Sequence, residues 1–105
     1  EALTRVVELV QAHLDEPLRV ADLAEAAGCS EAQLERRMKK VFGLTATQYV
    51  LRVRVERATE MLTGTDDPIA MIAAACGFYD QAGLTRQFAR LAGETPARFR
   101  ASHSG

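Results

Sequence analysis

Segments 20–49 and 69–99 are two versions of one pattern, and this repeat constrains the fold more than any other feature. Residues 20–28 align with residues 69–77 at an offset of 49, and after the glycine the offset becomes 50. The second copy therefore has one additional residue in its turn. Two copies are too few for a solenoid, so we expect two linked units. The pairs after the turn are Ala32 and Ala82, Leu34 and Leu84, Arg36 and Arg86, Met38 and Phe88, Gly43 and Gly93, Thr45 and Thr95, and Tyr49 and Phe99.

The spacing of apolar residues predicts an all-α fold of about seven helices, because no stretch alternates with the period of a strand. We expect a first helix-turn-helix subdomain over residues 1–45, a long linker helix over 46–63 and a second subdomain over 64–105. Ser102 to Gly105 read as a frayed tail. The expected helices lie at about 3–14, 20–27, 31–42, 46–62, 69–76 and 81–91, with a last short helix from Pro96.

Turn and capping residues separate these helices. Gly28 and its counterpart Gly77 suit the left-handed residue that ends a helix. Side-chain oxygens that can accept a bond from a first-turn N–H precede four helices. These capping residues are Ser30, Thr45, Asp80 and Thr95. Small residues should let the two helices of each pair approach, and the candidates are Ala24, Ala27, Ala73 and Ala74.

A short helix, a glycine turn and a second helix form the helix-turn-helix motif, whose second helix lies in the DNA major groove. At 3.6 residues per turn, the helix at 31–42 should bury Leu34, Met38 and Val41. The same rotation turns Leu84, Phe88 and Leu91 inward on the second helix of the other unit. The outward positions are Ala32, Arg36 and Lys40 in the first unit and Ala82, Arg86 and Arg90 in the second. Arginine can bond guanine through both O6 and N7, so Arg36 and Arg86 are candidate base contacts.

The charge balance argues against a nucleic-acid partner, because 13 basic and 14 acidic residues give a net charge of −1. The basic residues are nevertheless grouped, so the folded protein can carry a basic face. No apolar run approaches the roughly 20 residues of a membrane span, and we expect no membrane partner. The three basic clusters are Arg36, Arg37, Lys39 and Lys40; then Arg52, Arg54 and Arg57; and then Arg86, Arg90, Arg98 and Arg100.

Catalysis, cofactor and metal chemistry find no support in the sequence. Cys29 and Cys76 lie at the glycine turns and read as small packed residues. Together with His13 and His103 they show no metal-ligand spacing. We find no nucleophile, base and acid set and no phosphate-binding glycine loop, so we expect a protein that is not an enzyme.

The order of these elements resembles the DNA-binding domain of the AraC/XylS family of transcription regulators. The resemblance covers the chain from about Leu3 to Arg100. Its most specific part is residues 69–78, followed by Asp80-Gln81, Leu84-Thr85-Arg86-Gln87-Phe88 and residues 93–100. Met38, Ala46 and Phe99 depart from the common Phe, Pro and Tyr of the family.

The resemblance implies sequence-specific binding of double-stranded DNA in a bacterial, cytoplasmic regulator. Base contacts are expected from Ala32, Glu35, Arg36, Gln81, Ala82, Thr85 and Arg86. Phosphate contacts are expected from Lys39, Lys40, Thr45, Arg52, Arg90 and Thr95. Each has a plainer alternative: a solvated surface residue for most, a cap for Thr45 and Thr95, and for Glu35 an ion pair with Lys39 at i+4.

One chain with two recognition helices is expected to read two adjacent major-groove segments in an asymmetric operator of about two turns. The chain opens on Glu1 and not on Met, so we expect a fragment of a longer protein. The resemblance implies a sensor domain N-terminal to it, and RNA polymerase is a candidate partner. The alternative function is a helical protein-interaction module without specific DNA binding, which the net charge favours.

Overall fold

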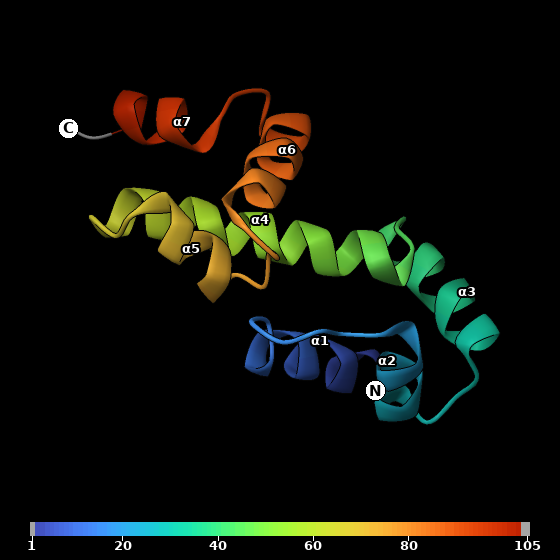
Figure 1. Cartoon of the computed structure of the whole chain (residues 1–105). Helices are drawn as coiled ribbons and strands as arrows, with labels where there is room; N and C mark the ends of the chain where they lie inside the picture. The colour runs from blue at the N-terminus through green and yellow to red at the C-terminus, as the bar shows by residue number, and fades with distance from the viewer. Residues whose placement is uncertain (1, 104–105) are drawn as a thin grey trace. The chain divides into compact units, whose positions relative to one another are not determined.

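The computed structural model describes residues 2–103, and this part of the chain contains seven helices and no strand, which confirms the all-α fold (Figure 1). The helices are α1 (Ala2–Ala12), α2 (Val20–Ala27), α3 (Glu31–Phe42), α4 (Ala46–Gly64), α5 (Ile69–Ala75), α6 (Gln81–Ala92) and α7 (Pro96–His103).

The chain divides into two compact units, Glu1–Val53 and Arg54–Gly105. The boundary falls inside α4, so the helix expected as a separate linker belongs in part to each unit. The first part of α4 supplies apolar residues to the core of the first unit, and the second part supplies them to the other.

The core of the first unit is formed where α1 packs on α2 and α2 packs on α3. Helix α1 ends at Ala12, two residues before the expected end, yet Leu14 in the following loop is still buried. Leu34 and Met38 of α3 are fully buried, as the helical periodicity predicted. The buried residues are Leu3, Val6, Val10, Leu14, Leu23, Ala24, Ala27, Leu34, Met38, Ala46, Val50 and Val53.

In the second unit α5 packs on α6, as α2 packs on α3 in the first, and α6 also packs on α7. Phe88 of α6 is fully buried, and its ring meets that of Phe99 edge-on at 5.4 Å between centroids. Burial of a side chain of this size contributes about 1.5–3 kcal/mol. The buried residues are Val55, Ala58, Leu62, Ile72, Ala73, Cys76, Leu84 and Phe88.

Two residues expected in the interior lie on the surface. Val41 is 60% exposed and lies one residue before the end of α3. Next to it, the ring of Phe42 contacts that of Tyr49 in a tilted arrangement, 4.7 Å between centroids. Ala74 is also exposed: the seven-residue helix α5 turns Ile72 and Ala73 inward, and the next position points about 100° away.

The C-terminal helix α7 is longer than expected. Ser102 and His103 are helical and not frayed, and residues 104–105 lie outside the described part of the chain. The ring of His103 stacks on that of Phe99 at 4.0 Å between centroids, and its Nδ1 lies 2.9 Å from the Phe99 carbonyl oxygen. These contacts hold the last turn of the helix.

Arg100 ties α7 to the end of α4 and the loop that follows it. Its Nε donates to the carbonyl oxygen of Leu62 at 3.0 Å, Nη1 to that of Asp67 at 2.7 Å, and Nη2 to that of Thr65 at 3.1 Å. The last carbonyls of a helix have no partner within it, so this fork satisfies groups that would otherwise need water. The sequence placed Arg100 in a basic surface cluster. Its guanidinium instead donates hydrogen bonds to backbone carbonyls of its own unit.

We predict that Arg100→Ala lowers the free energy of unfolding by about 1–3 kcal/mol, because three hydrogen bonds to backbone carbonyls are lost together. Arg100→Lys should recover only part of this, since an ammonium cannot reproduce the planar fork. Urea denaturation followed by circular dichroism measures both. Arg98→Ala, at an exposed position on the same helix, is the control and should change stability little. Equal stability of Arg100→Ala and Arg98→Ala would contradict a stabilising role for the three Arg100 hydrogen bonds.

Candidate nucleic-acid interface

Helix α3 begins at a capping box. The Ser30 Oγ accepts a hydrogen bond from the Gln33 backbone N–H at 3.2 Å, and the Ser30 N–H donates to Gln33 Oε1 at 3.0 Å. This confirms the predicted cap and sets the start of the helix. With Leu34 and Met38 buried, the opposite face is exposed to solvent, and it carries Ala32, Arg36, Arg37, Lys39 and Lys40.

Helix α6 begins in a related way. The Asp80 carboxylate accepts from the Gly83 N–H at 2.8 Å, which confirms Asp80 as the cap. The glycine inside this helix also has an explanation: Gly83 is buried, and a Cβ there would lie 3.3 Å from the same Asp80 oxygen. The absent side chain leaves room for the capping carboxylate.

The outer faces of α3 and α6 correspond, as the repeat predicted. Arg36 and Arg86 are both exposed, and each follows an exposed alanine one turn earlier, Ala32 or Ala82. Gln81 is exposed in the first turn of α6, whereas Thr85 is half-buried. A small residue beside an arginine allows a helix to lie close to base edges while the guanidinium reaches them.

Glu35 makes a contact that neither sequence interpretation anticipated. Its carboxylate Oε1 accepts a hydrogen bond from the Ala46 backbone N–H at 2.8 Å, and the side chain is half-buried. Ala46 is the first residue of α4, where N–H groups lack helical partners and the helix dipole favours a negative charge. This hydrogen bond therefore joins α3 to α4, where the sequence suggested an ion pair with Lys39, and a base contact by Glu35 stays a prediction.

The four basic residues that are expected to bind phosphates are all exposed. Lys39, Lys40 and Arg52 are exposed. Arg90 is also exposed and donates two hydrogen bonds to Gln87 Oε1, at 3.1 and 2.8 Å, which orients its guanidinium along α6.

Thr45 and Thr95 act as caps. The Thr45 Oγ1 accepts from the Gln48 N–H at 3.1 Å, and the Thr95 Oγ1 accepts from the Arg98 N–H at 3.2 Å. Capping therefore accounts for both threonines, and a phosphate contact by either stays a prediction.

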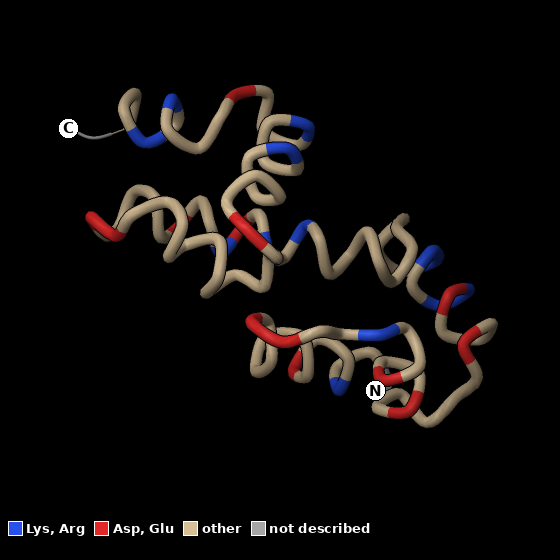
Figure 2. Tube along the Cα trace, viewed as in Figure 1, with Lys and Arg blue, Asp and Glu red and all other residues tan. Residues whose placement is uncertain are grey.

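Not every basic residue contributes to an exposed face. Arg57 lies 3.8 Å from the Glu60 carboxylate, and Arg54 is half-buried, where desolvation lowers the pKa of its guanidinium while the charge of Cys76 opposes that shift. Along α3 the acids come first and the basic residues follow, so the basic part of that helix is its second half (Figure 2). The middle cluster expected from the sequence is thus reduced mainly to Arg52.

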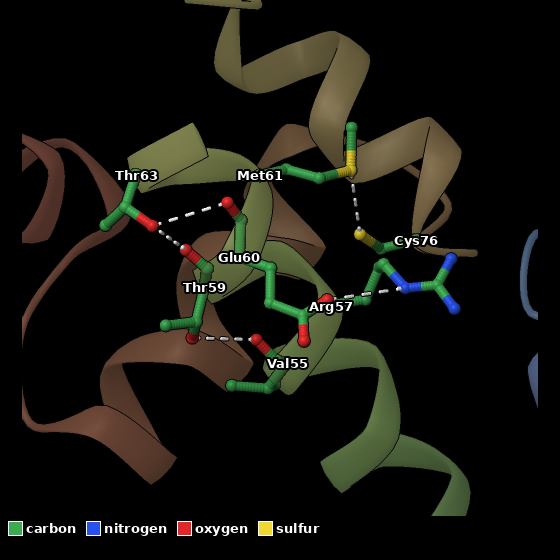
Figure 3. Close-up of polar contacts among 7 residues, drawn as sticks. All are labelled: Val55, Arg57, Thr59, Glu60, Met61, Thr63 and Cys76. Carbon is green, nitrogen blue, oxygen red and sulfur yellow. Dashed lines mark hydrogen bonds and ion pairs between the residues drawn. The ribbon is translucent and has the colours of Figure 1, made fainter. Parts of the chain in front are cut away.

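Cys76 is packed in the second core, as predicted. It is fully buried, and its Sγ lies 3.8 Å from the Met61 sulfur, next to the Arg57–Glu60 pair (Figure 3). Burial raises the pKa of this thiol to about 11, against opposing effects of Arg57 and Arg54. The thiolate is the reactive form of cysteine, so this group is inert near neutral pH. Both cysteines are free thiols.

Among residues 2–103 no group of three or more His, Cys, Asp or Glu side chains is arranged to hold a metal ion. In the same part of the chain, none of the helices combines the length and the apolar character that crossing a bilayer requires.

The geometry defines a helix-turn-helix protein with two such units, each presenting the outer face of its second helix. A family model described as a helix-turn-helix domain matches residues 23–102. A transcriptional regulator with an AraC-type DNA-binding domain from Chromobacterium violaceum is 34% identical, with a TM-score of 0.91 over 97% of this chain and 91% of that one. The chain therefore belongs to the AraC-type helix-turn-helix family, as the sequence motifs predicted. The domains of this family belong to transcription regulators, which are not a class of enzyme.

Two more relatives bear on function. The DNA-binding domain of the global transcriptional factor AdpA, solved in complex with a target DNA, is 31% identical with a TM-score of 0.92, over 98% of this chain and 93% of that chain. The transcriptional regulator ArgR of Pseudomonas aeruginosa is 33% identical over 98% of this chain. This chain spans 31% of the length of ArgR and 36% of that of the probable regulator LumQ of Photobacterium leiognathi.

Sequence reasoning missed the internal roles of Glu35 and Arg100. Both bind backbone groups that lie far along the chain, 11 residues away for Glu35 and 33 to 38 for Arg100. Helical periodicity reports only which face of a helix a residue occupies, so it carries no signal for such contacts.

We predict that Glu35→Ala lowers the free energy of unfolding by about 1 kcal/mol, because the first N–H of α4 loses its capping carboxylate. Glu35→Gln should retain most of the stability, since an amide oxygen can still accept this bond. Chemical denaturation measures both, and Glu56→Ala, an exposed acid within α4, is the control. A Glu35→Ala protein as stable as the control would show that the contact is unimportant.

Proposed function

We propose that this chain binds double-stranded DNA in a sequence-specific manner and so regulates transcription. The observation that carries the proposal is the equivalent exposure of Arg36 on α3 and Arg86 on α6, each on the second helix of a helix-turn-helix unit. Membership of the AraC-type family supports it, as does the solved complex of the AdpA domain with its target DNA.

In this proposal the outer faces of α3 and α6 contact base edges in the major groove. Arg36 and Arg86 donate to guanine, and the neighbouring alanine methyl groups meet thymine methyl groups. Gln81 offers an amide suited to adenine, while the half-buried Thr85 contributes its hydroxyl at closer range. The bases are therefore contacted by Ala32, Arg36, Gln81, Ala82, Thr85 and Arg86.

Glu35 is assigned a positioning role and not a base contact. Its carboxylate bonds the Ala46 N–H, so it holds α3 against the start of α4. The asymmetry between Glu35 and its counterpart Thr85 means that the two recognition helices do not present the same groups to DNA.

The remaining basic residues bind phosphates, which position the protein without specifying a sequence. The ionic phosphate contacts come from four exposed residues, Lys39, Lys40, Arg52 and Arg90. The first turns of α4 and α7, which Thr45 and Thr95 cap, add backbone N–H donors. The net charge of −1 keeps long-range attraction small. Binding should still fall steeply with salt, because each phosphate that a Lys or Arg neutralises releases counterions.

One chain carries two recognition helices, so we propose that a single molecule occupies two adjacent major-groove segments. Many helix-turn-helix proteins reach two grooves as dimers on palindromic sites. Because the two units here differ in sequence, their combined site is asymmetric.

The second candidate function is a protein-interaction module that does not bind specific DNA. The observations that favour it are the net charge and the exposed apolar residues Val41 and Met71. A gel-shift titration at low and moderate salt separates the two functions, because true DNA binding weakens strongly as salt rises.

The chain spans about a third of ArgR and LumQ. We therefore propose a longer bacterial protein with a sensor domain N-terminal to this one, acting in the cytoplasm and contacting RNA polymerase at its promoters.

Arg86→Ala is expected to cost about 1–3 kcal/mol of specific binding and to relax the preference at one base pair. Lys40→Ala should weaken binding to all sequences alike, because a phosphate contact carries no sequence information. Selection of bound sites from random duplexes, carried out with each variant, distinguishes these outcomes. If Arg86→Ala retains the wild-type site preference, the assignment of α6 as a recognition helix is wrong.

Footprinting of this chain on a selected duplex is expected to show an asymmetric site of about two turns with one protein bound. Native mass spectrometry of the complex supplies the stoichiometry. Protection of a palindrome by two chains would contradict the model of one chain per site. Protection of one groove segment alone would show that only one unit inserts its helix.

A further inference from the structure

Tyr79 is the residue that makes the second helix-turn-helix turn longer than the first. Before it, Phe78 corresponds to Cys29: the N–H of Phe78 bonds the Ala73 carbonyl at 2.9 Å, and the N–H of Cys29 bonds the Ala24 carbonyl at 3.1 Å. After it, Asp80 corresponds to Ser30, since both cap the following helix through the N–H three residues on. No position is left in the first turn to match Tyr79.

The inserted residue has no part in the core. Tyr79 is 100% exposed, the most exposed of the large apolar or aromatic residues, whereas its neighbour Phe78 packs against the second core. Asp80 completes the cap, so neither the turn nor the start of α6 requires a side chain at position 79. The Tyr79 ring is fully exposed and makes no contribution to the second core, so its side chain is free to contact a ligand.

The position of Tyr79 beside the first turn of α6 indicates which part of a DNA ligand it can contact. It directly precedes the cap of α6, and the exposed Gln81 and Ala82 of the first turn of that helix are the proposed base contacts nearest to it. In a helix-turn-helix protein the N-terminal residues of the recognition helix contact base edges. A long side chain just before them reaches the rim of the groove, where the phosphates lie.

We propose that Tyr79 binds a DNA phosphate beside the groove that α6 enters, with its phenolic hydroxyl as the donor. This inference rests on the proposed function and extends it to a contact made by the second unit alone. Tyrosine hydroxyls are among the common phosphate donors in protein–DNA complexes. Because the hydroxyl is neutral, the contact adds affinity without adding a basic charge to a chain whose net charge is −1.

The test compares Tyr79→Phe, Tyr79→Ala and Arg90→Ala on two duplexes, one selected from random sequences by the wild-type chain and one unrelated duplex of equal length. Tyr79→Phe should weaken binding roughly three- to tenfold on both duplexes, as the loss of one hydrogen bond predicts. Tyr79→Ala should lose a similar factor. Met71→Ala, which removes another exposed large side chain of the same unit, is the control and should stay within about twofold of wild type.

The salt dependence separates this contact from an ionic one. Arg90→Ala should reduce the slope of log affinity against log salt by about 1, because a released counterion is lost. Tyr79→Phe should leave the slope unchanged, since the phenol is uncharged.

A direct readout comes from tyrosine emission, because the chain contains two tyrosines and no tryptophan. A Tyr49→Phe variant leaves Tyr79 as the only tyrosine of the chain, so the tyrosine emission comes from Tyr79 alone. The second unit already carries a phenylalanine, Phe99, at the position equivalent to Tyr49. Its accessibility to iodide quenching should fall when the selected duplex binds.

The outcomes distinguish the two proposals. Wild-type affinity in Tyr79→Phe, or unchanged iodide quenching in the complex, with Arg90→Ala still weakened, would overturn the Tyr79 contact and leave DNA binding intact. A loss in Tyr79→Ala that Tyr79→Phe does not share would also overturn it, since the ring and not the hydroxyl would be in contact. Failure of the wild-type chain to bind either duplex at low salt would overturn the proposed function and this inference together.

Discussion

Each unit depends on the burial of one face of its second helix. Leu34 and Met38 do this in α3, and Leu84 and Phe88 do it in α6. A side chain of this size contributes about 1.5–3 kcal/mol when it leaves water, which is a substantial part of the stability of a small domain. Because the inner face is fixed in this way, the residues half a turn away are held on the outside, and these include Arg36 and Arg86. The proposed DNA contacts are thus set by the packing of apolar residues behind them.

Helix α4 supplies a wall to each core. Val50 and Val53 belong to the first cluster, and Ala58 and Leu62 to the second, with the change between residues 53 and 54. A helix that is apolar on one stripe early and on another stripe late has little amphipathic character as a whole, although each part is well packed locally. The first part of α4 therefore packs with the first unit and the second part with the other.

Several charged residues form hydrogen bonds or ion pairs within the fold, so their charges are less available to a ligand. Arg100 satisfies three carbonyls at and beyond the end of α4, and Glu35 satisfies the first N–H of the same helix. Arg57 lies against Glu60. A count of basic residues therefore overstates the positive face available to DNA. On α3, α4, α6 and α7 the basic residues that remain exposed are Arg36, Arg37, Lys39, Lys40, Arg52, Arg86, Arg90 and Arg98.

The sequence by itself determined the repeat, the all-α fold, the caps at Ser30 and Asp80 and the inward and outward faces of the two recognition helices. These features are local: a cap joins residues three apart, and a helical face follows from 3.6 residues per turn. Only the tertiary structure decided the roles of Glu35, Arg100 and Val41, and it placed the inserted residue of the repeat at Tyr79. Glu35 and Arg100 depend on which segment lies opposite, because contacts between residues 11 to 38 positions apart leave no periodic signal in the chain. The position of the insertion depends on the backbone hydrogen bonds of the two turns, which the sequence alignment does not show.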